Sequence, residues 1–187
     1  MRRPGADALV FQSLWTTGEP VPLDHLTRAE VAGPMWVRQQ GENVATDKDG
    51  NIIGFRGLSV QPTDHRLELP ERTLWTWCAF DAVGIMAAFE ASGRIVSADP
   101  LSGTPIKIDF QRGQPTTNDL VVFFADAPSG GVDRTDWCPL VNFFENAEAA
   151  NQWATERGRS GEPVSLIDAT RQGAAFWRPL AEADPGL

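Results

Sequence analysis

The chain has few residues that commonly bind metals or act as nucleophiles. Its 187 residues include only two histidines, His25 and His65, and two cysteines, Cys78 and Cys138. Neither histidine lies in a ligand-spaced motif, which argues against a histidine-based zinc site or a cysteine–histidine dyad. Two cysteines also provide no disulfide scaffold, and a reducing compartment would keep both as thiols.

Basic residues and long apolar runs are also scarce. The chain has 16 Lys and Arg against 25 Asp and Glu, a net charge of -9, which argues against a surface for nucleic acid or anionic membranes. No apolar run approaches the roughly 20 residues of a membrane-spanning helix. Arg2 and Arg3 have no apolar segment behind them, so the N-terminus does not resemble a secretory signal. We therefore expect a cytoplasmic protein of one domain, or one domain with a small appendage.

The N-terminal third predicts short helices and a hairpin. Apolar spacing predicts helices over residues 8–17 and 22–27, and short helices joined by tight turns are typical of helix-turn-helix or winged-helix elements. Because no basic stripe is present, packing is favoured over DNA binding. Residues 47–54 are rich in turn formers and predict a tight turn. Their acidic spacing resembles a calcium loop, but it is too short and is followed by Ile52 and Ile53 instead of further oxygen ligands.

The rest of the chain alternates between strand and helix patterns. The expected strands cover residues 55–60, 66–69, 94–97, 106–110, 120–125 and 164–167. The expected helices cover residues 74–89, which are apolar on all sides, residues 145–154, with Asn146 as N-cap, and a segment from Asp168 to Phe176.

A thiol and a carboxylate lie three residues apart at Cys78 and Asp81, so a helix over residues 74–89 would place both on one face. If Cys138 joined them, two thiolates would suit a soft metal such as Hg(II) or Cu(I) and would leave a zinc site incomplete. An apolar pocket would raise the pKa of Asp81, allowing it to protonate carbon while sulfur captures the metal. The alternative is structural: Cys78 fills the core, Asp81 binds backbone amides, and Cys138 is unrelated.

Several motifs together resemble the alkylmercury (organomercurial) lyase family. The most specific pair is WCAFD at residues 77–81 and WCPLVNFF at residues 137–144. Segments at residues 47–54, 102–105 and 147–153 are also similar to family segments, in the same order and at compatible spacing.

The resemblance implies an α+β fold, in which a shortened winged-helix-like portion (residues 1–65) packs on a mixed β-sheet core with helices (residues 66–187). It implies that Cys78 and Cys138 bind mercury, and that Asp81 assists proton transfer and protonates the organic group. The substrate would be a small organomercurial, no cofactor would be needed, and Hg(II) would pass to cellular thiols or a mercuric reductase. We expect a monomer with no nucleic-acid or membrane partner.

The chain departs from the family pattern at several places. Asp99 replaces a cysteine that is regarded as structural in the family, Trp137 stands where a Phe is usual, and Asn142 stands where His is frequent. Three alternatives to lyase activity follow from the residues and these departures. The first alternative is a soft-metal binding protein, the second is a divergent family member that acts on other substrates, and the third is a winged-helix regulator.

Overall fold

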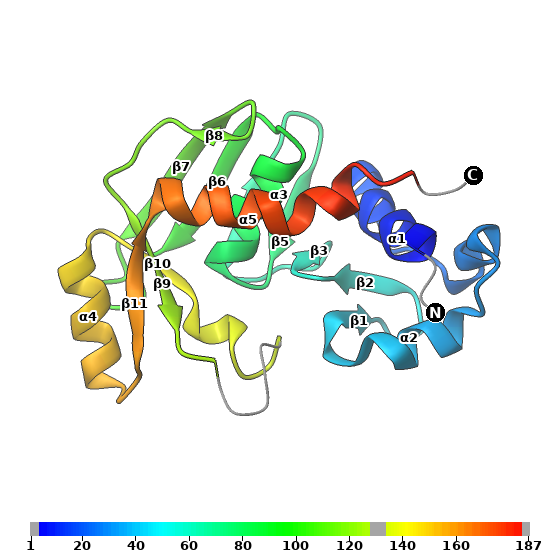
Figure 1. Cartoon of the computed structure of the whole chain (residues 1–187), viewed down its shortest axis with the longest axis horizontal. Helices are drawn as coiled ribbons and strands as arrows, with labels where there is room; N and C mark the ends of the chain where they lie inside the picture. Colours follow the sequence, from blue (N-terminus) through cyan, green and yellow to red (C-terminus); the bar gives the residue numbers. More distant parts are fainter. Residues whose placement is uncertain (1–3, 128–133, 185–187) are drawn as a thin grey trace.

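Two antiparallel sheets form the centre of the structure, a computed structural model that describes residues 4–127 and 134–184 (Figure 1). The larger sheet has eight strands in the order β1-β2-β3-β5-β4-β6-β7-β8, and the smaller has three in the order β10-β9-β11.

The strands of the large sheet are β1 (Val44–Thr46), β2 (Ile52–Phe55), β3 (Leu58–Ser59), β4 (His65–Glu68), β5 (Thr73–Thr76), β6 (Gly93–Ala98), β7 (Pro105–Gln111) and β8 (Gln114–Pro115). Those of the small sheet are β9 (Val121–Ala125), β10 (Asn142–Phe144) and β11 (Gly161–Ser165). The helices are α1 (Pro4–Thr17), η1 (Leu23–Ala29), α2 (Gly33–Gln40), η2 (Gly41–Asn43), α3 (Ala79–Ala88), η3 (Cys138–Leu140), α4 (Ala147–Glu156) and α5 (Leu166–Ala181).

The α+β class is confirmed, but the expectation of a mixed sheet was wrong. Every strand pair in the described part of the chain is antiparallel. Tight turns join many successive strands, and a tight turn permits only antiparallel pairing. The predicted turn after β1 is one of them: the Asp47 carboxylate accepts hydrogen bonds from the amides of Asp49 and Asn51, and Gly50 has φ +86°.

The predicted helix over residues 74–89 begins later than expected. Residues 73–76 form β5, which pairs with β3 on one side and β4 on the other. Threonine and tryptophan suit a pleated, half-buried surface, and two neighbouring strands satisfy the backbone there. Helix α3 starts at Ala79, so Cys78 lies at the junction between strand and helix.

Two other predictions concern helix starts. Asn146 caps α4 as predicted, because its side chain accepts a hydrogen bond from the Ala149 amide at 2.9 Å. Asp168 was expected to cap the last helix, but Ser165 does so by accepting from the Asp168 amide at 3.1 Å. The last strand, β11, accordingly ends at Ser165, not at residue 167.

Helix α3 is the buried centre of the fold. Nine of its ten residues are buried, and α5 crosses it at close range. A Cβ atom added to Gly84 would lie 2.4 Å from the Trp177 ring and 2.7 Å from the Gly173 Cα. The glycines therefore allow the two helices to approach, and this approach brings Trp177 beside the start of α3.

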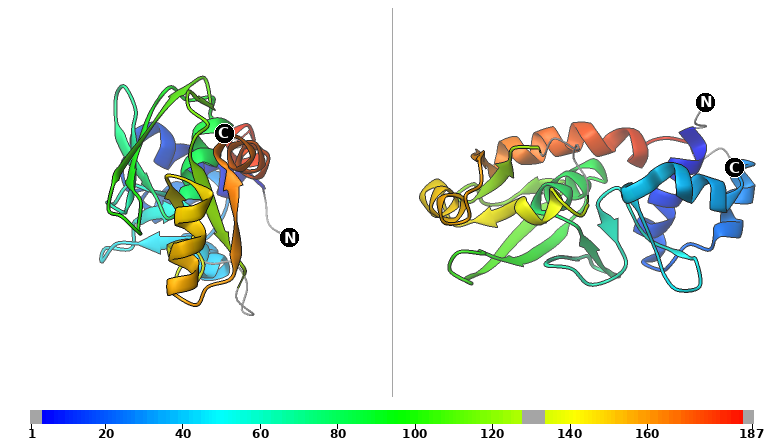
Figure 2. Two further views of the ribbon diagram at one scale, coloured as in Figure 1. Left: turned by 90° about the vertical axis from the view of Figure 1, so that its left-hand side faces the viewer. Right: turned by 90° about the horizontal axis from the view of Figure 1, so that it is seen from below.

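Helix α5 connects the two ends of the molecule. It runs from β11 past α3 to α1, with α4 at one end of the molecule and the N-terminal helices at the other (Figures 1 and 2). The strands that follow the N-terminal helices, β1 to β3, belong to the same sheet as β4 to β8. None of the described helices is long and apolar enough to cross a membrane.

Candidate active site

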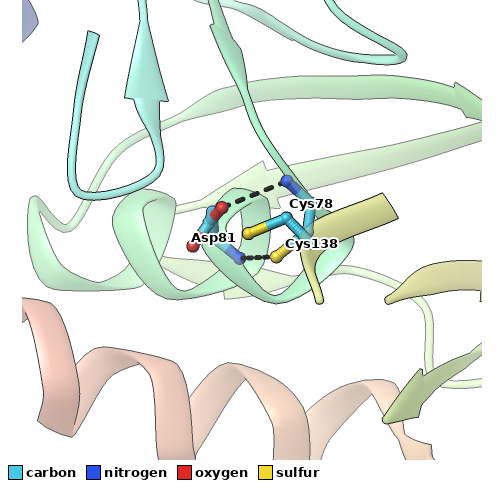
Figure 3. Close-up of side chains that lie close together, drawn as sticks. All are labelled: Cys78, Asp81 and Cys138. Atoms are coloured by element: carbon cyan, nitrogen blue, oxygen red, sulfur yellow. Dashed lines mark hydrogen bonds between the residues drawn. The ribbon is translucent and has the colours of Figure 1, made fainter. Parts of the chain in front are cut away.

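Cys78 and Asp81 are joined by reciprocal hydrogen bonds at the start of α3. Cys78 has extended backbone angles (φ -149°, ψ 172°) and is the N-cap residue. Its sulfur accepts a hydrogen bond from the Asp81 amide at 3.4 Å, and the Asp81 carboxylate accepts one from the Cys78 amide at 3.1 Å (Figure 3). This is the arrangement of a capping box, with cysteine in place of serine or threonine. The thiol and the carboxylate thus face each other because of the cap, not because of the predicted helical face.

Cys138 joins this pair from η3, between β9 and β10. The Ala79 amide donates to the Val141 carbonyl at 3.0 Å, which ties the start of α3 to the end of η3. The Trp137 indole donates to the Ala125 carbonyl at 2.8 Å and anchors the other side of η3. The two sulfur atoms and an Asp81 oxygen lie within 4.8 Å of one another, and both cysteines are free thiols. The structure therefore brings together all three residues that the sequence proposed for the site.

Burial dominates the electrostatics of these groups. It raises the pKa of Asp81 from 3.8 to about 7, against the opposing effect of the hydrogen bonds from Cys78. Burial also raises the pKa of the Cys78 thiol well above its usual value, and the neighbouring Cys138 and Asp81 raise it further. A carboxyl group with a pKa near neutrality can both accept and donate a proton under physiological conditions.

The three residues adjoin a cavity of 320 Å³. Asp81 and Cys138 line it, whereas Cys78 lies behind them and is fully buried. Much of the remaining wall is aromatic, and its polar members are two arginines and one asparagine. The other lining residues are Asn43, Arg56, Gly57, Trp77, Phe80, Arg134, Trp137, Phe176 and Trp177. Such a cavity suits an apolar group held against a reactive centre.

Gly57 makes room for the Asp81 carboxylate. A Cβ atom at this position would lie 2.3 Å from the Asp81 Cγ, and the φ of +89° also favours glycine. The Gly57 carbonyl accepts a hydrogen bond from the Trp77 amide at 2.9 Å. The turn between β2 and β3 therefore packs directly against the carboxylate and restricts its position.

Two of the residues that depart from the family pattern have local structural roles. Asp99 is fully buried, but its carboxylate accepts from the amides of Leu101, Ser102 and Glu145, which gives it a local structural role. Asn142 donates to the Pro139 carbonyl at 2.9 Å and so supports η3.

None of the sequence patterns pointed to Arg56 or Arg134 as cavity-lining residues, because the two arginines lie in a turn and a loop without periodicity.

A second buried pair lies away from the thiols. His65 and Ser97 are 2.9 Å apart, beside a more open cavity of 660 Å³. Burial lowers the pKa of His65 to about 4, so the imidazole is neutral at pH 7. No cysteine lines this cavity, and it contributes nothing to the thiol site.

Comparison with known proteins settles the family. The family model for alkylmercury lyase (MerB) matches residues 58–178, which include Cys78, Asp81 and Cys138. The chain belongs to the alkylmercury lyase family. A lyase of this family from Streptomyces lividans is 29% identical over 91% of this chain and 79% of its own length. A second lyase, from Staphylococcus epidermidis, is 27% identical over 90% of this chain and 80% of its own length. A crystal structure of the mercury-bound form of MerB2 has the same fold, with a TM-score of 0.82, 22% identity, and coverage of 97% of this chain and 93% of that one.

Replacing Asp81 with Asn should stabilise this alkylmercury lyase family member at pH 8 but not at pH 4. The unfolded chain loses the Asp81 proton near pH 3.8 and the folded chain near pH 7, so wild-type stability falls as the pH rises between these values. The amide of the Asp81→Asn variant carries no charge and escapes this loss. We expect its free energy of unfolding to exceed that of the wild type by about 1–3 kcal/mol at pH 8, as measured by urea denaturation at both pH values. A variant less stable than the wild type at pH 8 would contradict the raised pKa.

Proposed function

We propose that this chain cleaves the carbon–mercury bond of small organomercurials by protonolysis, releasing R–H and Hg(II) for mercury detoxification. The observation that carries the proposal is the assembly of two thiols and a carboxyl group within 4.8 Å beside a cavity. Family membership supports it, since the relatives from several species are named alkylmercury lyase. Thiolates prefer soft metals such as mercury, and the carboxyl group supplies the proton that bond cleavage requires.

Cys138 is the first thiol to meet the substrate. It lines the cavity and is 7% exposed, whereas Cys78 is fully buried. The substrate enters as R–Hg bound to a thiolate of the cell. The sulfur of Cys138 displaces that thiolate, and the proton of Cys138 leaves with it as a free thiol. Mercury then carries the organic group and one protein sulfur.

Asp81 moves the next proton. As the sulfur of Cys78 joins mercury, the thiol proton passes to the Asp81 carboxylate, which lies within 4.8 Å. Protonated Asp81 then donates this proton to the carbon bonded to mercury. The carbon–mercury bond breaks, R–H leaves, and mercury remains between Cys78 and Cys138. No electron is gained or lost in the cycle, so no redox cofactor takes part.

The product leaves by exchange with thiols. Two small cellular thiols, or the thiols of a mercuric reductase, take Hg(II) and return one proton to each cysteine. We propose that the chain acts as a monomer in the cytoplasm, where reducing conditions keep both cysteines as thiols.

The N-terminal residues have a covering role in this proposal. We propose that residues 1–65 are a shortened winged-helix-like portion and that residues 66–187 are the catalytic core. Asn43, Arg56 and Gly57 of the first part line the cavity, and Asp7 of α1 lies 3.8 Å from Arg56. In this proposal the N-terminal portion closes one side of the site.

Replacing Cys78, Asp81 or Cys138 with Ala should each reduce turnover by at least about 100-fold, since each removes a mercury ligand or the proton carrier. The measurement is benzene released from phenylmercury in excess thiol, followed by gas chromatography. Asp99→Asn is the matched control, because it changes another buried aspartate that lies outside the site. We expect this control to retain activity.

The same experiment separates cleavage from sequestration. A folded, reduced wild-type protein that releases no benzene would refute the lyase proposal. If that protein still bound one Hg(II) or Cu(I) per chain through both cysteines, the chain would be a soft-metal binding protein. If it bound neither ion, it would be a divergent member acting on another substrate.

Gly57→Ala should impair catalysis by moving Asp81. The added Cβ would lie 2.3 Å from the Asp81 Cγ, so the carboxylate must leave the position that the wild-type packing fixes. Moving a catalytic group by about 1 Å typically lowers the rate about 100-fold. Gly103→Ala is the matched control: its φ of +74° imposes a similar backbone penalty, but no atom lies within 4 Å of the new Cβ. Equal turnover by the two variants would show that the position of Asp81 is unimportant.

A further inference from the structure

The cavity combines aromatic walls with two guanidinium groups, and the reaction proposed above uses neither of these features. We propose that Arg56 and Arg134 bind a carboxylate carried by the substrate, so that the enzyme prefers organomercurial complexes with a negatively charged group. This inference rests on the proposed function and names the class of substrate that the site selects.

The aromatic walls fit a flat organic group. The Phe80 and Trp177 rings are 5.1 Å apart with their planes at 66°, and Phe176 lies 4.6 Å from Trp177 at 63°. These edge-to-face arrangements form a rigid apolar surface. The cavity of 320 Å³ is near the lower end of the usual range for small-molecule sites, which suits a single substituted ring.

Arg56 offers unused hydrogen-bond donors at this cavity. Its backbone is fixed, because its carbonyl accepts from the Trp177 indole at 2.8 Å. Its guanidinium approaches Asp7 at 3.8 Å, which is beyond hydrogen-bond distance. Its buried Nε–H has no hydrogen-bond partner among the described residues. Because this Nε is closed off from the cavity, a carboxylate would bind through the terminal nitrogens of the side chain, which is 27% exposed.

Arg134 is in the same situation. Its guanidinium lies over the Trp77 ring, 5.2 Å from the centroid. Its ion pair with Glu42 spans 3.6 Å, and its buried Nε–H also lacks a partner in the described part of the chain. By contrast, Arg66 and Arg94 each hold a carboxylate of the chain at 2.6 Å. The two cavity arginines thus retain the capacity to bind an external carboxylate, which guanidinium groups hold through paired hydrogen bonds.

Arg56 and Arg134 are the two basic members of the cavity wall, in a chain with a net charge of -9. A carboxylate that enters the cavity would meet these two guanidinium groups, whose partners in the chain lie at 3.8 and 3.6 Å.

The carboxylate has two possible sources in an organomercurial complex. It belongs either to the organic group, as in a mercurated benzoate, or to the thiol that accompanies mercury into the site, as in cysteine. Both sources present a carboxylate to the same two guanidinium groups. Varying the organic group and the accompanying thiol separately in the test distinguishes the two sources.

The test compares four substrate mixtures with wild-type protein. p-Mercuribenzoate and phenylmercury are each supplied with cysteine or with cysteamine, which lacks the carboxylate, and kcat/KM is measured for each mixture. We expect a preference on the order of 10-fold or more for a carboxylate-bearing mixture. A preference that follows the benzoate assigns the site to the organic group, and one that follows cysteine assigns it to the accompanying thiol.

Variants then identify the residues responsible. Arg134→Gln and Arg56→Gln should each lower kcat/KM more for the preferred carboxylate-bearing mixture than for phenylmercury with cysteamine, so that the ratio between the two falls toward 1. Arg157→Gln is the matched control: Arg157 also lies over an indole ring, at 5.0 Å from the Trp153 centroid, but does not line the cavity. It should keep the wild-type preference.

Failure of this inference differs from failure of the lyase proposal. Absence of turnover in all four mixtures by folded, reduced wild-type protein would refute the lyase proposal. Turnover without any preference among the four mixtures would refute the carboxylate site alone, and so would variants that lose activity equally in all mixtures. The wild-type comparison decides the question even if an arginine variant fails to fold.

Discussion

The reciprocal hydrogen bonds between Cys78 and Asp81 are the constraint on which the site depends. One pair of contacts starts the buried helix α3 and sets the thiol against the carboxylate. The structural and the chemical interpretations of these residues, which stood as alternatives for the sequence alone, are therefore compatible. The cap supplies the geometry, and burial supplies the raised pKa.

The second constraint is the junction of the two sheets. Cys78 follows a strand of the large sheet, whereas Cys138 precedes a strand of the small one. A backbone hydrogen bond from Ala79 to Val141 connects these segments, and α5 covers the junction. Neither sheet alone holds a complete site, so relative movement of the sheets would separate the proposed mercury ligands.

The sequence predicted which residues form the site better than it predicted the elements and contacts that hold them together. Residue types and spacing selected Cys78 and Asp81 and raised Cys138, the only other cysteine, as a possible partner, and the family resemblance then assigned Cys138 to the site. Residue chemistry does not determine which distant segments meet. The start of α3 was misplaced because residues 73–76 gain their structure from neighbouring strands. The cavity arginines had no sequence signal, because side chains from a turn and a loop converge only in the folded chain.

The separation of the two cysteines along the chain has a consequence during protein synthesis. Cys78 leaves the ribosome 60 residues before Cys138, so a nascent chain first presents a single thiol to any mercury in the cell. A single thiol competes poorly with abundant small thiols, and closing the loop to a second one carries an entropic cost. The two sulfurs therefore come within reach of one shared ion only when the segment around Cys138 has folded against the start of α3.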